Sequence, residues 1–385
     1  MIVRCDYSRR RFVTWAAALG GGLAAAAPAH ALSRTEGERS RTRVHYIAAE
    51  TVTWNYAPQG RNLVAARSFN SSERVVACTG DNRLGPVFEK SRYREYTDDT
   101  FTKPADRGHA PYTGLLGPVI RAQVGDTITV VFRNNTPFPA SMHPHGVFYS
   151  KGDEGVEAPG GDPGANGVVE PGGTHRYTWY VPERAGPGPD DPSSIGWVYH
   201  DHSVTMGVPG VHAGLVGPLV VSRRGEAAPD GSPYDVNREV FSLFQEFDEN
   251  DSHYLRRNID RFGGNRRIDE ASREFQRSNR KPSINGYLFG NGPRGVSDTS
   301  PSVILEKGKK TRWYVMALGG TRDTHTPHWH GNTVTIRGHR ADVVSVLPAT
   351  VVTADMRPDN SGNWLFHCHV DEHMLSGMST LYRVR

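Results

Sequence analysis

One pattern of short β-strands occurs twice along this 385-residue chain. The pattern is a strand, a turn, an alternating β-branched strand, a loop and a pair of histidines. It occupies residues 119–146, ending on His143-Pro144-His145-Gly146, and again residues 303–331, ending on His328-Trp329-His330-Gly331. A unit of short strands that occurs twice predicts two similar β-domains.

A second arm of the repeat follows each histidine pair. Residues 197–202, Trp-Val-Tyr-His-Asp-His, correspond position by position to residues 364–369, Trp-Leu-Phe-His-Cys-His. Each is followed by a loop with glycine and then an apolar run. The chain's 42 Gly and 26 Pro also suit short strands joined by turns. The predicted fold class is therefore all-β.

Two stretches of unusual composition organise the chain around this repeat. Residues 223–233 are rich in Gly, Ala, Pro and charge, which predicts a boundary between domains at 32–225 and 226–385. Residues 250–280 are highly charged. They could form one or two short surface helices, but the composition favours a solvated insertion.

The first 31 residues resemble an export signal. Ser8-Arg9-Arg10-Arg11-Phe12-Val13 resembles a twin-arginine motif, a weakly apolar stretch follows, and Ala29-His30-Ala31 is a small-x-small cleavage site. We expect a periplasmic or extracellular protein that does not insert in the membrane once the signal is removed. The alternative, an uncleaved anchor, is disfavoured because the apolar stretch is short and interrupted by glycine.

Charge and cysteine content exclude two further classes. The formal net charge of +4 falls to near zero without residues 1–31, so a nucleic-acid footprint is not expected. Of the three cysteines, Cys5 leaves with the signal, so a disulfide framework is not expected either. Cys78 is interpreted as a small apolar side chain, whereas Cys368 lies between two histidines and suggests a metal thiolate.

Histidines are concentrated in four short clusters, which hold ten of the 17 in the chain. Residues i and i+2 of a strand point to the same face, so each His-x-His presents two imidazoles side by side. Eight imidazoles are too many for one tetrahedral zinc but suit a cluster of several copper ions. The four pairs are His143 and His145, His200 and His202, His328 and His330, and His367 and His369.

Cys368 predicts a second and different metal site. Its sulfur points to the strand face opposite His367 and His369, while His373 and Met378 follow at intervals of five residues and His325 precedes His328. One Cys, two His and a distant Met form a blue-copper electron-transfer site. Such a site would lie one residue of backbone away from the histidine cluster. Coincidental or zinc-binding histidines are the disfavoured alternative.

These motifs together resemble the copper-binding motifs of multicopper oxidases, a family that includes laccases and ceruloplasmin. Residues 46–58, 96–101 and Ile284-Asn285-Gly286-Tyr287 are similar to ceruloplasmin in particular, and the resemblance covers residues 43–385. It implies two cupredoxin-like Greek-key β-barrels and four coppers per functional site, one type 1, one type 2 and two type 3. The ligands implied are His325, Cys368, His373 and Met378 for type 1, His143 and His328 for type 2, and His145, His200, His202, His330, His367 and His369 for type 3.

Asp201 occupies the position in the first unit that Cys368 occupies in the second. The first domain should therefore carry cluster ligands without a type 1 copper, which resembles the small two-domain laccases. In that group the cluster forms between domain 1 of one subunit and domain 2 of the next. The resemblance therefore implies a homotrimer with three inter-subunit clusters.

The resemblance also implies residues that supply protons or receive electrons. Glu154 is the expected acid–base residue of oxygen reduction, with Asp153 beside it, and Tyr149 matches a tyrosine near the cluster of small laccases. Each also has a plain interpretation, as solvated loop carboxylates and a core aromatic ring. The expected substrates are O2 and a small reducing donor.

Three kinds of donor are open: phenols and aromatic amines, Fe(II) and Cu(I). The absence of a Met-rich run argues against Cu(I). Glu372 beside His373 suits Fe(II), but Arg277 and Pro282 stand where ceruloplasmin has further iron-holding side chains. We therefore favour a laccase-like oxidase, with a ferroxidase as the alternative. A copper nitrite reductase is disfavoured because it needs no type 3 pair and keeps its type 1 copper in the first domain. A non-enzymatic copper or electron carrier is disfavoured because it would not need eight cluster histidines.

Overall fold

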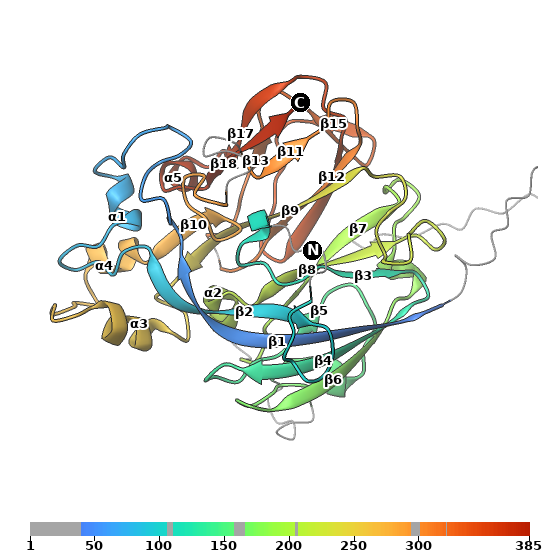
Figure 1. Cartoon of the computed structure of the whole chain (residues 1–385), viewed down its shortest axis with the longest axis horizontal. Helices are drawn as coiled ribbons and strands as arrows, with labels where there is room; N and C mark the ends of the chain where they lie inside the picture. The colour runs from blue at the N-terminus through green and yellow to red at the C-terminus, as the bar shows by residue number, and fades with distance from the viewer. Residues whose placement is uncertain (1–39, 106–110, 158–165, 205–206, 294–300, 321) are drawn as a thin grey trace, which may run out of the picture. The chain divides into compact units, whose positions relative to one another are not determined.

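Two sheets enclose the first half of the repeat, in a computed structural model that describes residues 40–105, 111–157, 166–204, 207–293, 301–320 and 322–385. One sheet has the strand order β2-β1-β4-β6 and the other β3-β8-β7-β5 (Figure 1). Neighbours that are not consecutive in sequence mark crossovers between the sheets. The strands are β1 (Thr42–Asn55), β2 (Val87–Tyr96), β3 (Ile120–Gln123), β4 (Thr127–Asn135), β5 (His143–Pro144), β6 (Thr174–Tyr180), β7 (Ser194–His200) and β8 (Val216–Ser222).

The second half of the repeat also builds two sheets. Their strand orders are β10-β9-β12-β16-β14-β15 and β11-β18-β17-β13. The strands are β9 (Arg238–Asp248), β10 (Arg280–Ile284), β11 (Val303–Leu305), β12 (Thr311–Ala317), β13 (Pro327–Trp329), β14 (Val334–Ile336), β15 (His339–Ala341), β16 (Thr350–Met356), β17 (Gly362–Cys368) and β18 (Ser379–Val384). The prediction of an all-β fold is confirmed.

The strand register shows how closely the two halves correspond. β1 runs parallel to β4 as β9 runs parallel to β12, and β3 runs parallel to β8 as β11 runs parallel to β18. In the first half His143 lies opposite His200, and in the second half His328 lies opposite His367. The duplicated pattern in the sequence is thus a duplicated set of strand pairings.

Three apolar cores hold these sheets together. One is built from residues of the first half, including Ile128 and Trp179, and one mainly from the second half, including Trp313 and Phe366. The third combines both halves, with Leu116 and Phe241 among its members and Cys78 half-buried at its edge. The proposed boundary at residues 225 and 226 stays a prediction. Residues 1–31, the expected signal, lie outside the described part of the chain.

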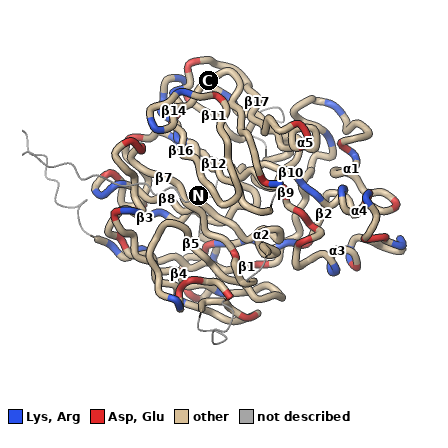
Figure 2. Tube along the Cα trace, turned by 180° about the vertical axis from the view of Figure 1, so that it is seen from behind, with Lys and Arg blue, Asp and Glu red and all other residues tan. Residues whose placement is uncertain are grey.

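Short helices decorate the sheets, and none of those described is long and apolar enough to span a bilayer. They are α1 (Glu73–Ala77), η1 (Pro111–Thr113), η2 (Lys151–Asp153), η3 (Glu183–Ala185), α2 (Pro209–Ala213), α3 (Leu255–Phe262), α4 (Arg273–Ser278) and α5 (Asp371–Leu375). Charges of both signs occur along α3 and α4 (Figure 2).

The expectation of a solvated insertion at residues 250–280 is wrong. This segment forms α3 and α4, and Tyr254 and Phe275 in it are fully buried. Arg257 and Arg261 of α3 both form ion pairs with Glu89 of β2. The charged composition concealed this packing because the helices are anchored by a few apolar side chains and by cross-domain ion pairs. Neither the few apolar side chains nor the charged residues recur with a helical period in such short segments, so the sequence pattern did not reveal the helices.

A buried ion pair joins the two halves of the molecule. Lys90 of β2 and Glu249, the residue after β9, form an ion pair, and both side chains are fully buried. The Lys90 ammonium also donates to the carbonyl of His212 (2.7 Å), and the Tyr56 hydroxyl donates to Glu249 (2.5 Å). A buried ammonium and a buried carboxylate tolerate this position only as a pair, so the pair couples the packing of both halves.

We expect Glu249→Gln to lower the free energy of unfolding by about 3–5 kcal/mol, because it leaves the Lys90 ammonium buried without a counter-charge. Urea unfolding of the metal-free protein measures this. The double variant Lys90→Met/Glu249→Leu should recover most of the loss, and exposed Glu306→Gln should change stability by no more than about 0.5 kcal/mol. A loss no larger than that of the exposed control would contradict the role of the pair.

Candidate metal centres

Cys368, His325 and His373 converge inside the second barrel. The Cys368 Sγ lies 3.6 Å from His373 Nδ1 and 3.9 Å from His325 Nδ1, and the two Nδ1 atoms are 3.1 Å apart. An ion at the centre of this triangle would lie at ordinary metal–ligand distances of roughly 2 Å. All three side chains are buried.

Met378 lies at the same end of the barrel. Its backbone N–H donates to the His373 carbonyl (2.9 Å), and its carbonyl accepts from the Cys368 N–H (3.0 Å). The Met378 side chain belongs to the same buried core as Cys368. The structure therefore gathers the four residues predicted for the type 1 site, which come from the end of β17, from α5 and from the residues preceding β13 and β18.

The thiol of Cys368 is prepared to act as an anion. Burial raises its pKa, but hydrogen bonds from His325, His373 and the backbone N–H groups of Thr326 and Val370 outweigh burial and bring the pKa to about 6. The thiolate is the form that binds a metal. The local hydrogen bonds thus favour the metal-binding form near neutral pH.

Asp323 is a functional residue that sequence reasoning missed. Its carboxylate accepts a hydrogen bond from His325 Nε2 (3.2 Å) and from the backbone N–H groups of Glu246 (2.7 Å) and Gly320 (2.9 Å). Asp323 is 2% exposed. Because it holds Nε2, it orients His325 with Nδ1 toward Cys368, as carboxylates commonly do for metal-bound histidines.

Four histidines of the first half form a second cluster. The ring centroid of His143 lies 5.4 Å from His145, 5.5 Å from His200 and 5.5 Å from His202. The Nε2 atoms of His145 and His200 approach to 3.1 Å. Burial lowers the pKa of His145 to about 4 and that of His200 to about 3, so these imidazoles are neutral and free to bind a cation.

The second half contributes an equivalent cluster. The His328 ring lies 4.4 Å from His330, 5.2 Å from His367 and 5.5 Å from His369. Burial also lowers the pKa of His328 and of His367. The two His-x-His pairs of the first half thus form one cluster, and the two pairs of the second half form another.

Backbone carbonyls fix the orientation of several of these rings. His200 Nδ1 donates to the carbonyl of Asp201 (2.9 Å), and His367 Nδ1 donates to the carbonyl of Cys368 (2.8 Å). His143 Nδ1 donates to the carbonyl of Glu154 (2.7 Å). Each bond holds Nδ1 and leaves Nε2 to face the other imidazoles. That pattern is typical of metal-binding histidines.

The two four-histidine clusters do not meet within the described chain. The groups of potential ligands are His143, His145 and His200 in one place and His328, His330 and His367 in another. Ring contacts likewise join histidines only within each half. Within residues 40–385 as described, each half therefore offers four imidazoles at a partly exposed face.

The chemistry of these donors fits copper. A buried thiolate with two imidazoles and a thioether is the soft, trigonal donor set of a blue-copper site, and neutral imidazoles suit copper as well. Hard cations such as Mg²⁺ or Ca²⁺ would require oxygen ligands instead.

The expected acid–base residues lie beside the first cluster. The Tyr149 ring lies 5.7 Å from the His143 ring, and Glu154 contacts His143 through its carbonyl, while its carboxylate pairs with Lys151 (2.5 Å). The Asp153 carboxylate turns elsewhere, to the Ser150 hydroxyl (2.8 Å) and to His175. Of the two residues, Glu154 is the one whose backbone contacts a cluster histidine.

Electron entry at the type 1 site would pass its buried histidines. Glu372 is exposed on α5, next to His373, which is 6% exposed. Glu246, another residue that the sequence did not single out, is also 6% exposed. Burial and then the neighbouring Asp323 raise the pKa of Glu246 to about 7. Carboxylates therefore approach this site from α5, from β9 and from the loop before β13.

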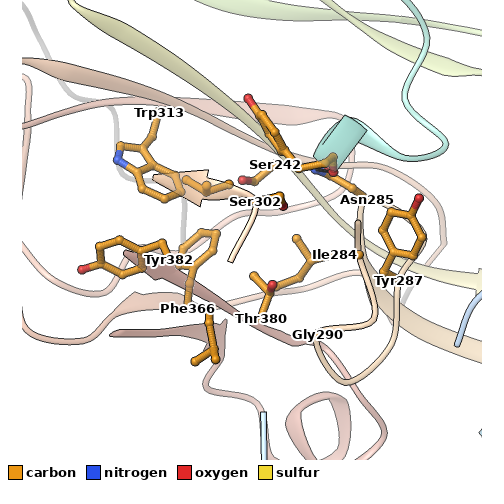
Figure 3. A pocket seen from close by; sticks show the side chains of 14 residues that line it. Ser242, Ile284, Asn285, Tyr287, Gly290, Ser302, Trp313, Phe366, Thr380 and Tyr382 are labelled. Atoms are coloured by element: carbon orange, nitrogen blue, oxygen red, sulfur yellow. Dashed lines mark hydrogen bonds between the residues drawn. The ribbon is translucent and has the colours of Figure 1, made fainter. Parts of the chain in front are cut away.

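Two cavities differ in how they relate to these sites. A void of about 30 Å³ inside the second barrel is bordered by Trp313, Phe366 and Tyr382 and by Asn285 and Tyr287, but by none of the predicted ligands (Figure 3). It has room for a water molecule but not for a donor. A cavity of about 390 Å³ between β7 and β16 does border a cluster ligand, His145.

Known proteins share both the motifs and this architecture. Family models described as Multicopper oxidase match residues 112–226 and 269–385, which are more than half of the chain. The chain belongs to the multicopper oxidase family. Each match contains one pair of histidine motifs, so the family's pattern coincides with the two clusters described above.

Curated relatives in the family are much longer than this chain. Hephaestin from Homo sapiens is 38% identical over 355 residues, which are 89% of this chain and 29% of hephaestin. Ceruloplasmin from Ovis aries is 35% identical over 350 residues, 89% of this chain and 32% of ceruloplasmin. The chain thus spans about a third of the length of these relatives.

Solved structures show the same fold. A multicopper oxidase crystal structure superposes with a TM-score of 0.56 at 18% identity, covering 89% of each chain. The blue copper oxidase from Nitrosomonas europaea superposes with a TM-score of 0.51 at 18% identity, covering 90% of this chain and 86% of the other. These likenesses confirm two cupredoxin-like β-barrels.

We expect Asp323→Asn to weaken the type 1 site. The Asn side chain can occupy the same space, but it lacks the negative charge of the carboxylate that holds His325 Nε2–H. Outer-shell changes of this kind typically cost about 10–100-fold in metal affinity. Copper titration followed by visible absorption measures the loss. The exposed neighbour Arg322→Gln should leave the affinity unchanged, and equal affinities for the Asp323 variant and the parent protein would contradict the role of Asp323.

Proposed function

We propose that this protein oxidises a small reducing donor at a type 1 copper and reduces O2 to water at a trinuclear copper cluster. The observation that carries the proposal is the position of Cys368. Its sulfur belongs to the buried three-ligand site, while His367, the residue before it, belongs to the four-histidine cluster. One peptide unit therefore connects a site suited to electron transfer with a site suited to multi-electron chemistry.

Four coppers per functional site are proposed, with the ligands assigned by the family resemblance. When bound, copper supplies one-electron oxidation at the thiolate site and four-electron reduction of oxygen at the histidine site. The protein orients the imidazoles through backbone carbonyls and keeps the thiolate site dry. Glu154, attached through its backbone to His143, is the proposed acid–base residue, and Tyr149 borders the same ring.

We further propose a homotrimer in which the clusters form between subunits. Eight histidines are needed for three coppers, yet within the described chain the two four-histidine groups lie apart. Three of the four histidines in each group are at least partly exposed, so each face can receive ligands from another copy. Cyclic closure with three copies would pair every first-half cluster with a second-half cluster.

Export by a twin-arginine signal to the periplasm or cell exterior belongs to the same proposal. It is supported by Arg9, Arg10 and Arg11 and by Ala29-His30-Ala31 in the sequence. Removal of the signal would leave Cys78 and Cys368, both of which are free thiols in the structure.

Complementation tests both the cluster and the trimer. We expect His200→Ala/His202→Ala to keep the blue absorption, because its type 1 ligands are intact, but to lose oxygen uptake. We expect the same of His328→Ala/His330→Ala. Mixed trimers of the two variants should recover part of the activity, since one of their interfaces has only intact histidines.

Each outcome of that experiment has a clear meaning. Oxygen turnover by either variant alone would contradict the cluster assignment. Inactive mixed trimers, with copper-loaded parent protein active, would contradict clusters shared between subunits. A parent protein that is monomeric by sedimentation would also contradict clusters shared between subunits.

The donor is proposed to be a phenol or aromatic amine, with Fe(II) as a second candidate. Arg277 is exposed on α4 and carries the wrong charge for holding iron, which favours the first candidate. Two observations favour the second. Glu246 lies opposite Pro282 in the β9–β10 register and brings a carboxylate to the type 1 histidines from an unexpected strand. Two of the relatives, moreover, carry the name ferroxidase.

Oxygen uptake with a methoxyphenol and with Fe(II), under matched conditions, decides between these donors. Faster uptake with the phenol and little with Fe(II) is expected for a laccase-like enzyme. If Fe(II) is oxidised with saturation, Glu246→Gln should raise its KM roughly tenfold, equivalent to about 1.4 kcal/mol. Glu306→Gln is the matched control. Saturable Fe(II) oxidation that Glu246→Gln and Glu372→Gln both leave unchanged would exclude these carboxylates as the iron subsite.

A further inference from the structure

Asp201 lies in the same backbone pocket that holds the Cys368 thiol in the other half. The backbone N–H of Ser141, two residues before His143, donates to Asp201 Oδ1 (2.7 Å), just as the N–H of Thr326, two residues before His328, donates to Cys368 Sγ (3.4 Å). The N–H of Ser203 donates to Asp201 Oδ2 (3.4 Å). Its counterpart Val370 donates its N–H to Cys368.

The surroundings of the two pockets differ where the metal ligands would be. Ala140 occupies the position of His325, and Leu215, whose carbonyl accepts from the Asp201 N–H as that of Met378 accepts from the Cys368 N–H, occupies the position of Met378. Both are buried and neither can bind a metal. Gly210 occupies the position of His373, because its carbonyl accepts from the Leu215 N–H as the His373 carbonyl accepts from the Met378 N–H. The first half thus has the anion pocket without the copper ligands.

Hydroxyl groups stabilise the Asp201 carboxylate in place of a bound cation. The Ser203 hydroxyl donates to Asp201 Oδ2 (2.9 Å), and the Ser141 hydroxyl lies 3.5 Å from Oδ1. Asp201 is only 2% exposed, and its carboxylate also fills the space left by Gly210 of α2, where an added Cβ would collide with Oδ2. A buried carboxylate that receives several hydrogen bonds is well satisfied without a counter-ion.

These contacts tie together the segments that carry the cluster histidines. Ser141 leads into His143, Asp201 lies between His200 and His202, and the His202 N–H donates to the Ser141 hydroxyl (3.0 Å). The carbonyl of Asp201 also accepts a hydrogen bond from His200 Nδ1 (2.9 Å). One residue therefore joins the β5 segment to the end of β7 through its side chain, while its backbone orients an imidazole.

We propose that Asp201 is a positioning residue that replaces a copper–thiolate unit and holds the first-half histidines of the trinuclear cluster in place without a metal of its own. In the second half, Cys368 and its copper would connect the segments at His325, His373 and Met378. In the first half, Asp201 makes the corresponding connection through hydrogen bonds. The proposal rests on the proposed copper cluster and adds a role that no ligand assignment contains.

The test substitutes Asn for Asp201 in the full-length, copper-loaded protein. In Asp201→Asn the amide places its N–H groups against the N–H of Ser203. The hydrogen bonds that join the two histidine segments are therefore weakened, while the side-chain volume stays the same. We expect type 2 and type 3 copper, followed by electron paramagnetic resonance and near-ultraviolet absorption, to bind at least about tenfold more weakly. The type 1 absorption of the second half should stay at the parent level.

A second, milder variant grades the effect. Ser203→Ala removes one hydroxyl donor and leaves the carboxylate with both backbone N–H groups, so it should weaken cluster copper by only about threefold or less. Ser376→Ala, on a surface turn of the second half, serves as the matched hydroxyl control and should change neither signal.

The remaining outcomes are also decisive. Type 2 and type 3 signals within about twofold of the parent in Asp201→Asn would overturn the proposal. Equal loss of the type 1 absorption would also overturn it, because it would show a general folding role instead of a local one. A parent protein with neither blue absorption nor oxygen uptake would instead contradict the proposed function itself.

Discussion

The alternation of side chains at the end of β17 is the constraint on which the rest of the molecule depends. Cys368 points into the second barrel and meets His325 and His373, while His367 and His369 point to the other face and meet His328. Two different coordination environments, one dry and soft and one partly open, are therefore built on a single strand end. The strand pairings of β13, β17 and β18 keep this end rigid.

Duplication explains how the first half could specialise. Both halves pair a histidine of one strand with a histidine of its neighbour, His143 with His200 and His328 with His367, so both inherited a four-imidazole face. A pocket with two backbone N–H groups also survives in both. It stabilises an anion, and either a thiolate or a carboxylate satisfies it. Replacing the thiolate by Asp201 removes one copper site without loosening the histidines beside it.

Polar groups buried between the halves set their relative packing more specifically than apolar contacts could. Lys90 and Glu249 are fully buried and come from different halves, and Glu89 gathers Arg257 and Arg261 of α3. Apolar cores tolerate small shifts, whereas an unpaired buried charge does not. The charged segment that carries α3 thus belongs to the interface between the halves, although its composition resembles that of a solvated loop.

The sequence by itself predicted the duplicated all-β fold and the residues that the structure gathers at its two kinds of histidine site, because short-range rules place them. A period of two residues places His-x-His on one face and the intervening Cys on the other, and such spacing can be read without knowing the fold. Tertiary structure alone decided which distant groups support those ligands. Asp323 reaches His325 because its loop crosses the end of β9, Glu246 approaches from that strand, and Asp201 meets Ser141 across β5 and β7. Only the three-dimensional structure, too, shows the two histidine clusters apart, since their separation depends on how the two halves pack and not on any spacing along the chain.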